Sequence, residues 1–311
     1  MAATKTSQHF ADRLVAAIQK KGSPICMGLD PRLDRLPKFL LKAAKEKKGE
    51  TLEAAADAIF EFNKGLIDAT HDLVPVVKPQ FAFYVQYGSA GVRAFEETCK
   101  YAQSKGLLVI ADTKSNDIGS TAEAYAQGIM GEVDVFGKKV VPLGVDAVTV
   151  NPYLGYDGIK PFIEVCRKMN RGVFILVKTS NPSSSDLQSR VTVDEKIAVS
   201  DLMGQFVESW GADEIGESGY SSVGAVVGAT FPQEAAKLRI MMPQNFFLVP
   251  GFGAQGGKID DVKACFNEDG LGAIINSSRE INFAWEESGN EKKYAEAARE
   301  VVLKMAKQLR F

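Results

Sequence analysis

Eight short apolar segments recur along the chain and alternate with segments of helical periodicity. Each apolar segment is aliphatic or β-branched throughout, a pattern typical of strands that are buried on both faces. The predicted strands are Pro24–Leu29, Val74–Lys78, Leu107–Ala111, Asp146–Val150, Val173–Val177, Val223–Val227, Phe246–Val249 and Gly272–Asn276. The predicted helices are Ser7–Lys21, Thr51–Ala69, Gly88–Lys105, Ser120–Met130, Gly158–Lys168, Pro232–Met241, Lys258–Phe266 and Glu291–Leu309.

This alternation leaves two architectures open, an eight-stranded (β/α)8 TIM barrel and a doubly wound open sheet. The count of eight strands with a closing helix favours the barrel. We expect one domain over residues 1–311, because no repeat or linker divides the chain. A barrel of about 250 residues is typical, so two insertions are predicted. One follows the first strand and includes Lys42–Glu50, as a solvated helix or loop, and the other is Asn181–Tyr220 after the fifth strand.

Composition excludes several classes of protein. Hydrophobic residues make up 45% and charged residues 24%, which permits a large core, and the net charge of -2 offers no basic surface for nucleic acid. No apolar run approaches the roughly 20 residues of a membrane span, and the N-terminus lacks a signal peptide's apolar core, so a cytoplasmic location is expected. The four cysteines are far apart, which predicts free thiols. Only two histidines are present, which disfavours mechanisms with a histidine base.

Charged residues gather at the predicted carboxyl ends of the first three strands, where a barrel carries its chemistry. Asp30 follows the first strand, Lys78 ends the second, and Asp112, Lys114 and Asp117 follow the third. Asp112 and Lys114 are two residues apart, so an extended chain would point both to the same side. An ion-pair network at the barrel rim is the alternative, since buried charges must be paired. Charge at three neighbouring strand ends favours catalysis.

A glycine-rich segment follows the seventh strand and matches GxGxxG from Gly251 to Gly256. As a Rossmann fingerprint it would place an NADP phosphate near Ser278 and Arg279. Only one strand follows, however, and a dinucleotide-binding sheet cannot be built around it. A phosphate site formed by the loops after strands seven and eight fits better, with backbone N–H groups and Arg279 binding a dianion. A plain glycine turn is the alternative.

The ordered set of motifs resembles the longer, divergent branch of the orotidine 5′-phosphate decarboxylase family. The matching segments are Met27–Pro31, Val77–Gly88, Ala111–Thr121, Thr149–Gly155, Leu176–Ser184, Val226–Thr230, Val249–Gly257 and Ile275–Ile281. The resemblance implies a barrel assembled as a homodimer with shared active sites. It also implies decarboxylation of orotidine 5′-monophosphate (OMP) to UMP and CO₂, the last step of de novo pyrimidine nucleotide synthesis, with no cofactor and no metal.

The resemblance also implies roles for single residues. Lys78, Asp112, Lys114 and Asp117 match the family's catalytic tetrad, and Asp117 and Thr121 would reach the neighbouring subunit's site. Lys114 would stabilise the carbanion at ring carbon C6 and protonate it. The expected substrate contacts are Asp30 and Lys78 to ribose, Thr179, Ser180 and Gln80 to the pyrimidine, and Gln255, Ser278 and Arg279 to the phosphate.

Three other functions fit parts of the pattern. A magnesium-dependent sugar-phosphate enzyme of the same superfamily would need a carboxylate at the end of strand two, where this chain has Lys78. A Schiff-base aldolase could use Lys178 or Lys114. A barrel that only binds nucleotides would need no catalytic lysine. The loops near Asn181 and Gln255 are expected to act as lids.

Overall fold

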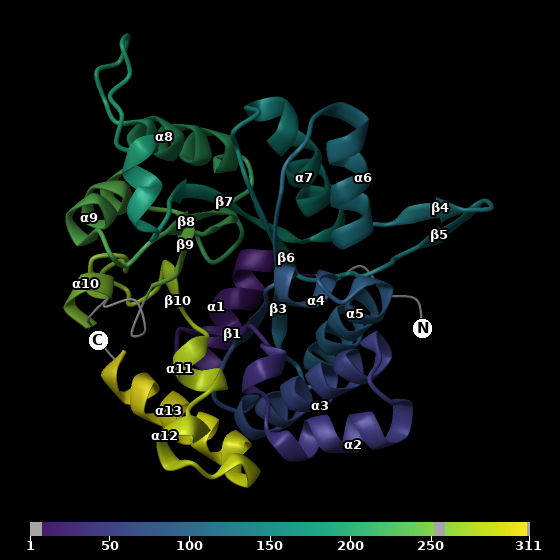
Figure 1. Ribbon diagram of the computed structural model, residues 1–311. Coiled ribbons are helices and arrows are strands. Elements are labelled where there is room, and N and C mark those ends of the chain that lie inside the picture. The colour runs from purple at the N-terminus through teal and green to yellow at the C-terminus, as the bar shows by residue number, and fades with distance from the viewer. Residues whose placement is uncertain (1–7, 252–258, 310–311) are drawn as a thin grey trace. The chain divides into compact units, whose positions relative to one another are not determined.

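The computed structural model describes residues 8–251 and 259–309. Eight parallel strands close a barrel in the order β1-β10-β9-β8-β7-β6-β3-β2, and helices alternate with them along the chain (Figure 1). The strands are β1 (Ile25–Leu29), β2 (Val76–Pro79), β3 (Leu108–Ser115), β6 (Ala147–Val150), β7 (Gly172–Lys178), β8 (Ser221–Val227), β9 (Asn245–Val249) and β10 (Ala273–Ser277). The predicted (β/α)8 barrel is confirmed, and the open sheet is excluded.

The α-helices are α1 (Phe10–Lys21), α2 (Lys38–Lys48), α3 (Leu52–Thr70), α4 (Ala82–Val85), α5 (Gly88–Ser104), α6 (Gly119–Ile129), α7 (Tyr156–Met169), α8 (Val199–Gly211), α9 (Pro232–Met241), α10 (Ile259–Lys263), α11 (Arg279–Asn282), α12 (Trp285–Ser288) and α13 (Tyr294–Gln308). Short 3₁₀ helices cover Leu33–Arg35, Pro182–Asp186 and Glu291–Lys293. None of the helices in the described part of the chain is long and apolar enough to cross a membrane. All four cysteines are buried and unbridged, as the sequence predicts.

The chain forms two compact units. The first unit consists of the residues up to Ala16 together with Lys114–Asn276, and the second consists of Ala17–Thr113 together with Ser277–Arg310. The boundary after Ala16 falls within α1, and the other two fall within strands, because β3 and β10 each contribute residues to both units. The single domain over residues 1–311 stays a prediction.

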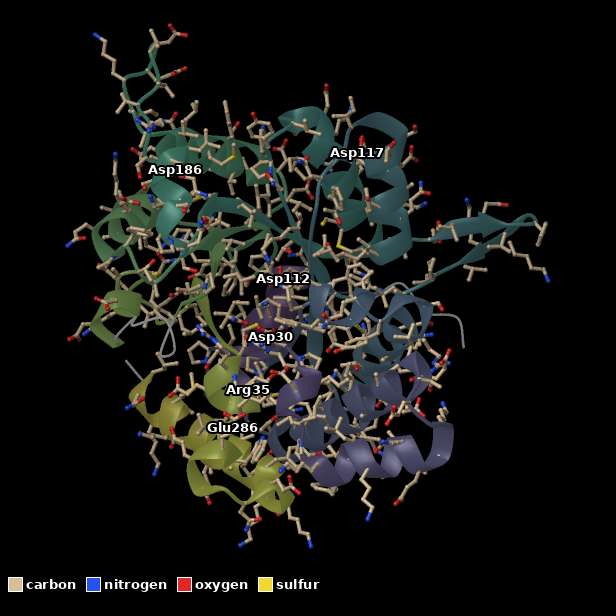
Figure 2. All side chains as sticks on the ribbon, viewed as in Figure 1. Asp30, Arg35, Asp112, Asp117, Asp186 and Glu286 are labelled. Atoms are coloured by element: carbon tan, nitrogen blue, oxygen red, sulfur yellow. The ribbon has the colours of Figure 1, made fainter. Side chains whose placement is uncertain are left out.

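The second unit is held together by aromatic packing around α3. Phe62 is fully buried and stacks on Tyr294 at a ring-centroid distance of 5.2 Å and on Phe283 at 6.2 Å. Arg35 lies 3.8 Å from the centroid of the Phe283 ring and pairs with Glu286 on α12, and Figure 2 labels both partners. These contacts stabilise the unit through buried apolar area and a partly exposed cation–π interaction. They tie the segments after β1 and β10 to α3.

The first unit depends on close packing at two glycines. A Cβ at Gly172 would lie 2.2 Å from the Phe10 ring, and a Cβ at Gly224 would lie 2.7 Å from the Phe174 ring. Phe10 meets Phe174 edge-on at 6.1 Å between ring centroids. Only glycine leaves room for these rings against the strands. The amino-terminal helix is thereby packed on β7, which explains the apolar face that the sequence gives to it.

Two features differ from the sequence prediction. The segment Asn181–Tyr220, predicted as an insertion, contains helix α8, which packs on β7 and β8. A β-hairpin of β4 (Val133–Val135) and β5 (Lys138–Val140) was not predicted at all. In the first insertion, the charged run forms part of helix α2 and exposes most of its side chains, so the helical alternative is the correct one there.

Candidate active site

A buried ion pair forms the centre of the candidate site in the second unit. The Lys78 Nζ lies 2.5 Å from Asp112 Oδ2, and both side chains are about 6% exposed. Gln80 Nε2 donates a hydrogen bond of 3.0 Å to the same oxygen. Parallel pairing of β1 with β2 and of β2 with β3 brings these strand ends to one edge. The structure therefore brings together three residues that the sequence nominated.

The electrostatics of this pair favour a charged ammonium. Burial acts to lower the pKa of Lys78, but the negative charges of Asp112 and Asp30 outweigh it, so the pKa of Lys78 is raised. Burial raises the pKa of the nearby Cys26 thiol to about 12, which leaves it protonated at neutral pH. At neutral pH the charged group at this strand end is therefore the lysine rather than the cysteine.

Asp30 is fixed by a residue that the sequence did not nominate. Its backbone N–H donates to Asn282 Oδ1 at 3.0 Å, and Asn282 Nδ2 donates to the Gly28 carbonyl at 2.7 Å. Asn282 is fully buried and ends α11. The same short helix begins at Arg279, whose side chain is exposed, after the half-buried Ser278. Asn282 thus links the end of β1 to the segment where phosphate contacts are predicted.

Lys114 belongs to the first unit and has an unusual backbone. Its φ of 49° lies in the left-handed region, which non-glycine residues rarely adopt. Its N–H donates to Thr149 Oγ1 at 3.1 Å, and Thr149 is fully buried on β6. This φ departs from the extended backbone on which the prediction for Asp112 and Lys114 is based, and that they share one side stays a prediction. Strain of this kind is typical of functional positions.

Asp117 lies just before α6, and the backbone N–H of the next residue binds its carboxylate. Its Oδ1 accepts a hydrogen bond of 2.8 Å from the Ile118 N–H, and Figure 2 labels it. A Cβ at Gly158 of α7 would lie 2.7 Å from the Asp117 carbonyl oxygen, so glycine permits this close approach. Thr121 follows in the first turn of α6 with an exposed side chain. No side chain caps the amino-terminal end of this helix.

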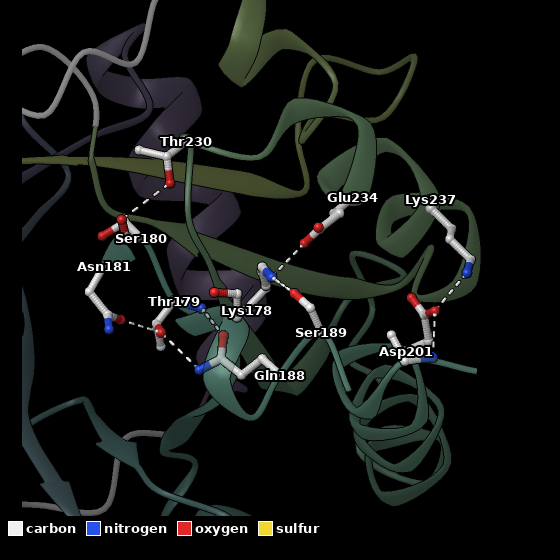
Figure 3. Close-up of polar contacts among 12 residues, drawn as sticks. Lys178, Thr179, Ser180, Asn181, Gln188, Ser189, Asp201, Thr230, Glu234 and Lys237 are labelled. Atoms are coloured by element: carbon white, nitrogen blue, oxygen red, sulfur yellow. Dashed lines mark hydrogen bonds and ion pairs between the residues drawn. The ribbon is translucent and has the colours of Figure 1, made fainter. Parts of the chain in front are cut away.

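Two of the three residues predicted to contact the pyrimidine, Thr179 and Ser180, follow β7 directly (Figure 3). Thr179 is bound through both its N–H and its hydroxyl by Gln188, at 2.9 and 2.8 Å. Ser180 lies against β8, where a Cβ at Gly228 would approach its N and Cα atoms to 2.8 Å. Its carbonyl accepts a hydrogen bond of 3.3 Å from Thr230. Both residues are half-buried and tightly positioned.

Lys178 makes contacts that do not suit a Schiff base. It is 1% exposed, and its Nζ lies 2.9 Å from Glu234 Oε2 and 2.9 Å from Ser189 Oγ. The Phe231 ring centroid is 4.4 Å away. A Schiff-base lysine must reach a substrate carbonyl with a free amine, whereas this amine is enclosed and bonded. These contacts disfavour Lys178 as the nucleophile of an aldolase.

The predicted phosphate site is only partly visible. Gln255 and the second and third glycines of the GxGxxG pattern lie outside the described residues. The described residues contain no group of three or more histidine, cysteine or acidic side chains arranged to hold a metal ion.

Comparison with known proteins identifies a single family. The model of the orotidine 5′-phosphate decarboxylase / HUMPS family matches residues 23–294. Two proteins named orotidine 5′-phosphate decarboxylase are similar: one from Rhodopirellula baltica is 44% identical over 97% of this chain and 99% of its own, and one from Caldicellulosiruptor bescii is 43% identical over 89% and 90%. The solved structure of Leishmania donovani OMP decarboxylase matches with a TM-score of 0.73 and 30% identity, over 97% of this chain and 99% of that one. The chain belongs to the orotidine 5′-phosphate decarboxylase / HUMPS family.

Proposed function

We propose that the chain decarboxylates OMP to UMP and CO₂ without a cofactor, and that Lys114 stabilises and protonates the carbanion at C6. Decarboxylation of OMP is the activity for which its relatives are named, and it is the last step of de novo pyrimidine nucleotide synthesis. The observation that carries the mechanism is the buried Lys78–Asp112 pair at the ends of adjacent strands. A desolvated ion pair costs free energy to maintain, so its presence beside exposed ligand-binding residues favours catalysis.

The chemistry requires a fixed positive charge at one carbon. The bond from C6 to the carboxylate breaks, CO₂ leaves, and the electron pair stays on C6. The Lys114 ammonium stabilises this charge and then donates a proton to the same carbon. Its side chain is exposed in the absence of substrate, which leaves it accessible to a nucleotide.

The other charged residues would orient this step. Asp112 is held by donors from Lys78 and Gln80 and would lie against the substrate carboxylate. This contact destabilises or orients the ground state. Lys78 and Asp117 would keep Lys114 charged and aimed at C6.

Substrate binding would use residues from several strand ends. We assign Asp30 and Lys78 to the ribose hydroxyls, which fits their adjacent strands. The remaining assignments are Thr179, Ser180 and Gln80 to the pyrimidine, and Gln255, Ser278 and Arg279 to the phosphate. Phosphate binding, remote from the reacting carbon, would drive closure of the loops near Asn181 and Gln255.

The same proposal extends to assembly. A homodimer would place Asp117 and Thr121 of each subunit in the partner's site, and their position beside the exposed amino-terminal end of α6 is compatible with that. We also propose that residues 1–311 act as one domain and that the enzyme is cytoplasmic.

The test is the loss of substrate absorbance on incubation with OMP, with EDTA present. Lys114→Ala should lower kcat by about 10³-fold or more, because it removes both the proton donor and the preorganised charge. Lys160→Ala, on the exposed face of α7, is the matched control and should retain full activity. Equal rates for Lys114→Ala and wild type would contradict the role of Lys114, and inhibition by EDTA would favour the magnesium-dependent alternative.

A further inference from the structure

The side-chain amide of Gln188 makes two hydrogen bonds to Thr179, and together they permit only one orientation of the amide. Thr179 N–H donates to Gln188 Oε1 at 2.9 Å, and Gln188 Nε2 donates to Thr179 Oγ1 at 2.8 Å (Figure 3). A backbone N–H can only donate, so the amide oxygen must face it. The amide nitrogen then necessarily faces the hydroxyl. The two bonds together fix which way the Gln188 amide points.

This orientation determines the polarity of the Thr179 hydroxyl. A hydroxyl has one proton and two acceptor lone pairs. Because one lone pair accepts from Gln188, the proton goes to the other close neighbour, Asn181 Oδ1, at 2.6 Å. Among the bonds of the described residues, one acceptor lone pair of Oγ1 remains. A hydroxyl arranged in this way accepts a hydrogen bond from a ring N–H but has no proton to donate to a ring nitrogen.

Gln188 is itself held from both sides. Its N–H donates to the Ser184 carbonyl at 2.8 Å, and its carbonyl accepts from the Ser200 N–H at 2.9 Å. The next residue, Ser189, accepts a hydrogen bond of 2.9 Å from the buried Lys178. Gln188 is thus hydrogen-bonded to Thr179, the first residue of the loop, and Ser189 is hydrogen-bonded to Lys178, the last residue of β7. Support of this kind is what keeps a binding group in one geometry.

We propose that Gln188 is a positioning residue for recognition of the base: it holds the Thr179 hydroxyl as an acceptor for the ring N–H of a uracil-type pyrimidine. This inference rests on the proposed function, because it assumes that Thr179 contacts the base of the nucleotide. It adds a residue from a segment that carries no recognisable motif.

The first experiment separates base recognition from support of the whole site. Gln188→Leu is compared with wild type for the Kd of UMP and for the inhibition constant of ribose 5-phosphate, which lacks the base. We expect UMP binding to weaken about tenfold, the value of one or two hydrogen bonds, with ribose 5-phosphate unchanged. The KM for OMP should rise more than kcat falls. Gln233→Leu makes the same chemical change at an exposed position of α9 and should leave all of these values unchanged.

The second experiment tests whether Gln188 acts through Thr179. In a Thr179→Val background, Gln188→Leu should have no further effect on the Kd of UMP, whereas independent roles would give additive losses. Additive losses, or equal weakening of UMP and ribose 5-phosphate, would overturn the inference. If Gln188→Leu does not fold, Gln188→Ala takes its place with the same expectations. Failure of the wild type to decarboxylate OMP would instead overturn the proposed function, which is a separate readout.

Discussion

Two lysines lie at the carboxyl ends of barrel strands in this molecule, and both are buried beside a carboxylate. Lys78 is the last residue but one of β2 and pairs with Asp112, while Lys178 ends β7 and pairs with Glu234. In sequence the two positions are equivalent, and both were considered as catalytic lysines or nucleophiles. Their partners distinguish them. Asp112 is 6% exposed and lies on the adjacent strand, whereas Glu234 is 43% exposed and lies in the first turn of α9.

The backbone explains why the second lysine is turned to different partners. The pairing of β7 with β8 shifts register between Leu176 and Lys178, which interrupts the alternation of side chains along the strand. The Lys178 amine then contacts Phe231 and Glu234, which belong to the start of α9. The pairing of β1 with β2, by contrast, runs without interruption through Pro79, so the strand keeps its register past Lys78.

The largest expected effect is on activity. Lys78→Met should lower kcat/KM by about 10³-fold, because it removes a fixed charge from the proposed catalytic group. Lys178→Met, the matched change at the other lysine, should lower it by no more than about tenfold, because Lys178 only supports the loop that carries Gln188. Both are measured by the loss of OMP absorbance. Comparable losses of kcat/KM for Lys78→Met and Lys178→Met would contradict the prediction that Lys78 acts in catalysis and Lys178 does not.

The two carboxylates should differ next in stability. Asp112→Ala leaves the buried ammonium of Lys78 without its nearest partner, so we expect a loss of about 3 kcal/mol in the free energy of unfolding. Glu234→Ala also takes the carboxylate from a buried ammonium, but Ser189 Oγ and the Phe231 ring still contact the Lys178 amine, so we expect a smaller loss of about 1 to 2 kcal/mol. Urea denaturation followed by circular dichroism measures both. A larger loss for Glu234→Ala than for Asp112→Ala would contradict the interpretation that Lys78 depends more on its carboxylate than Lys178 does.

Much of the fold and half of the candidate site could be predicted from the sequence. The apolar runs gave all eight barrel strands, because strands buried on both faces need continuous apolar residues. Lys78 and Asp112 could be nominated because charge is unusual at the end of such a run. Helix α8 was missed although its apolar residues recur at helical spacing, because the whole segment Asn181–Tyr220 was interpreted as an insertion.

Three features of the candidate site leave no local pattern in the sequence. Asn282 binds the backbone of Asp30 across 252 positions, and no local pattern announces such a bond. Gln188 is nine positions from Thr179 in a loop without periodicity. The left-handed backbone of Lys114 could not be foreseen, since the residue type opposes it. One signal could have indicated Gln188: it is a polar residue with no assigned role in the long loop that follows a barrel strand.

The smallest expected effect is a dependence of stability on pH that isolates the Lys78 pair. The pKa of Lys78 is raised in the folded state above its ordinary value of 10.5, because Asp112 and Asp30 outweigh the effect of burial. The folded state therefore binds the proton more tightly than the unfolded state does. The stabilisation is fully present below pH 10.5 and is lost as the pH rises through the folded pKa, with a slope of at most about 1.4 kcal/mol per pH unit.

The measurement is the difference in unfolding free energy between wild type and Lys78→Met. That difference should be constant from pH 8 to about pH 10 and should narrow above it, because alkali removes the charge that the substitution removes. Ile59→Val, which changes a buried side chain without a titrating group, should show a constant difference over the whole range. If the difference in unfolding free energy between wild type and Lys78→Met also stays constant, the carboxylates do not raise the pKa of Lys78 in the folded state. Lys78 and Lys178 would then differ only in where their carboxylate partners, Asp112 and Glu234, lie in the fold.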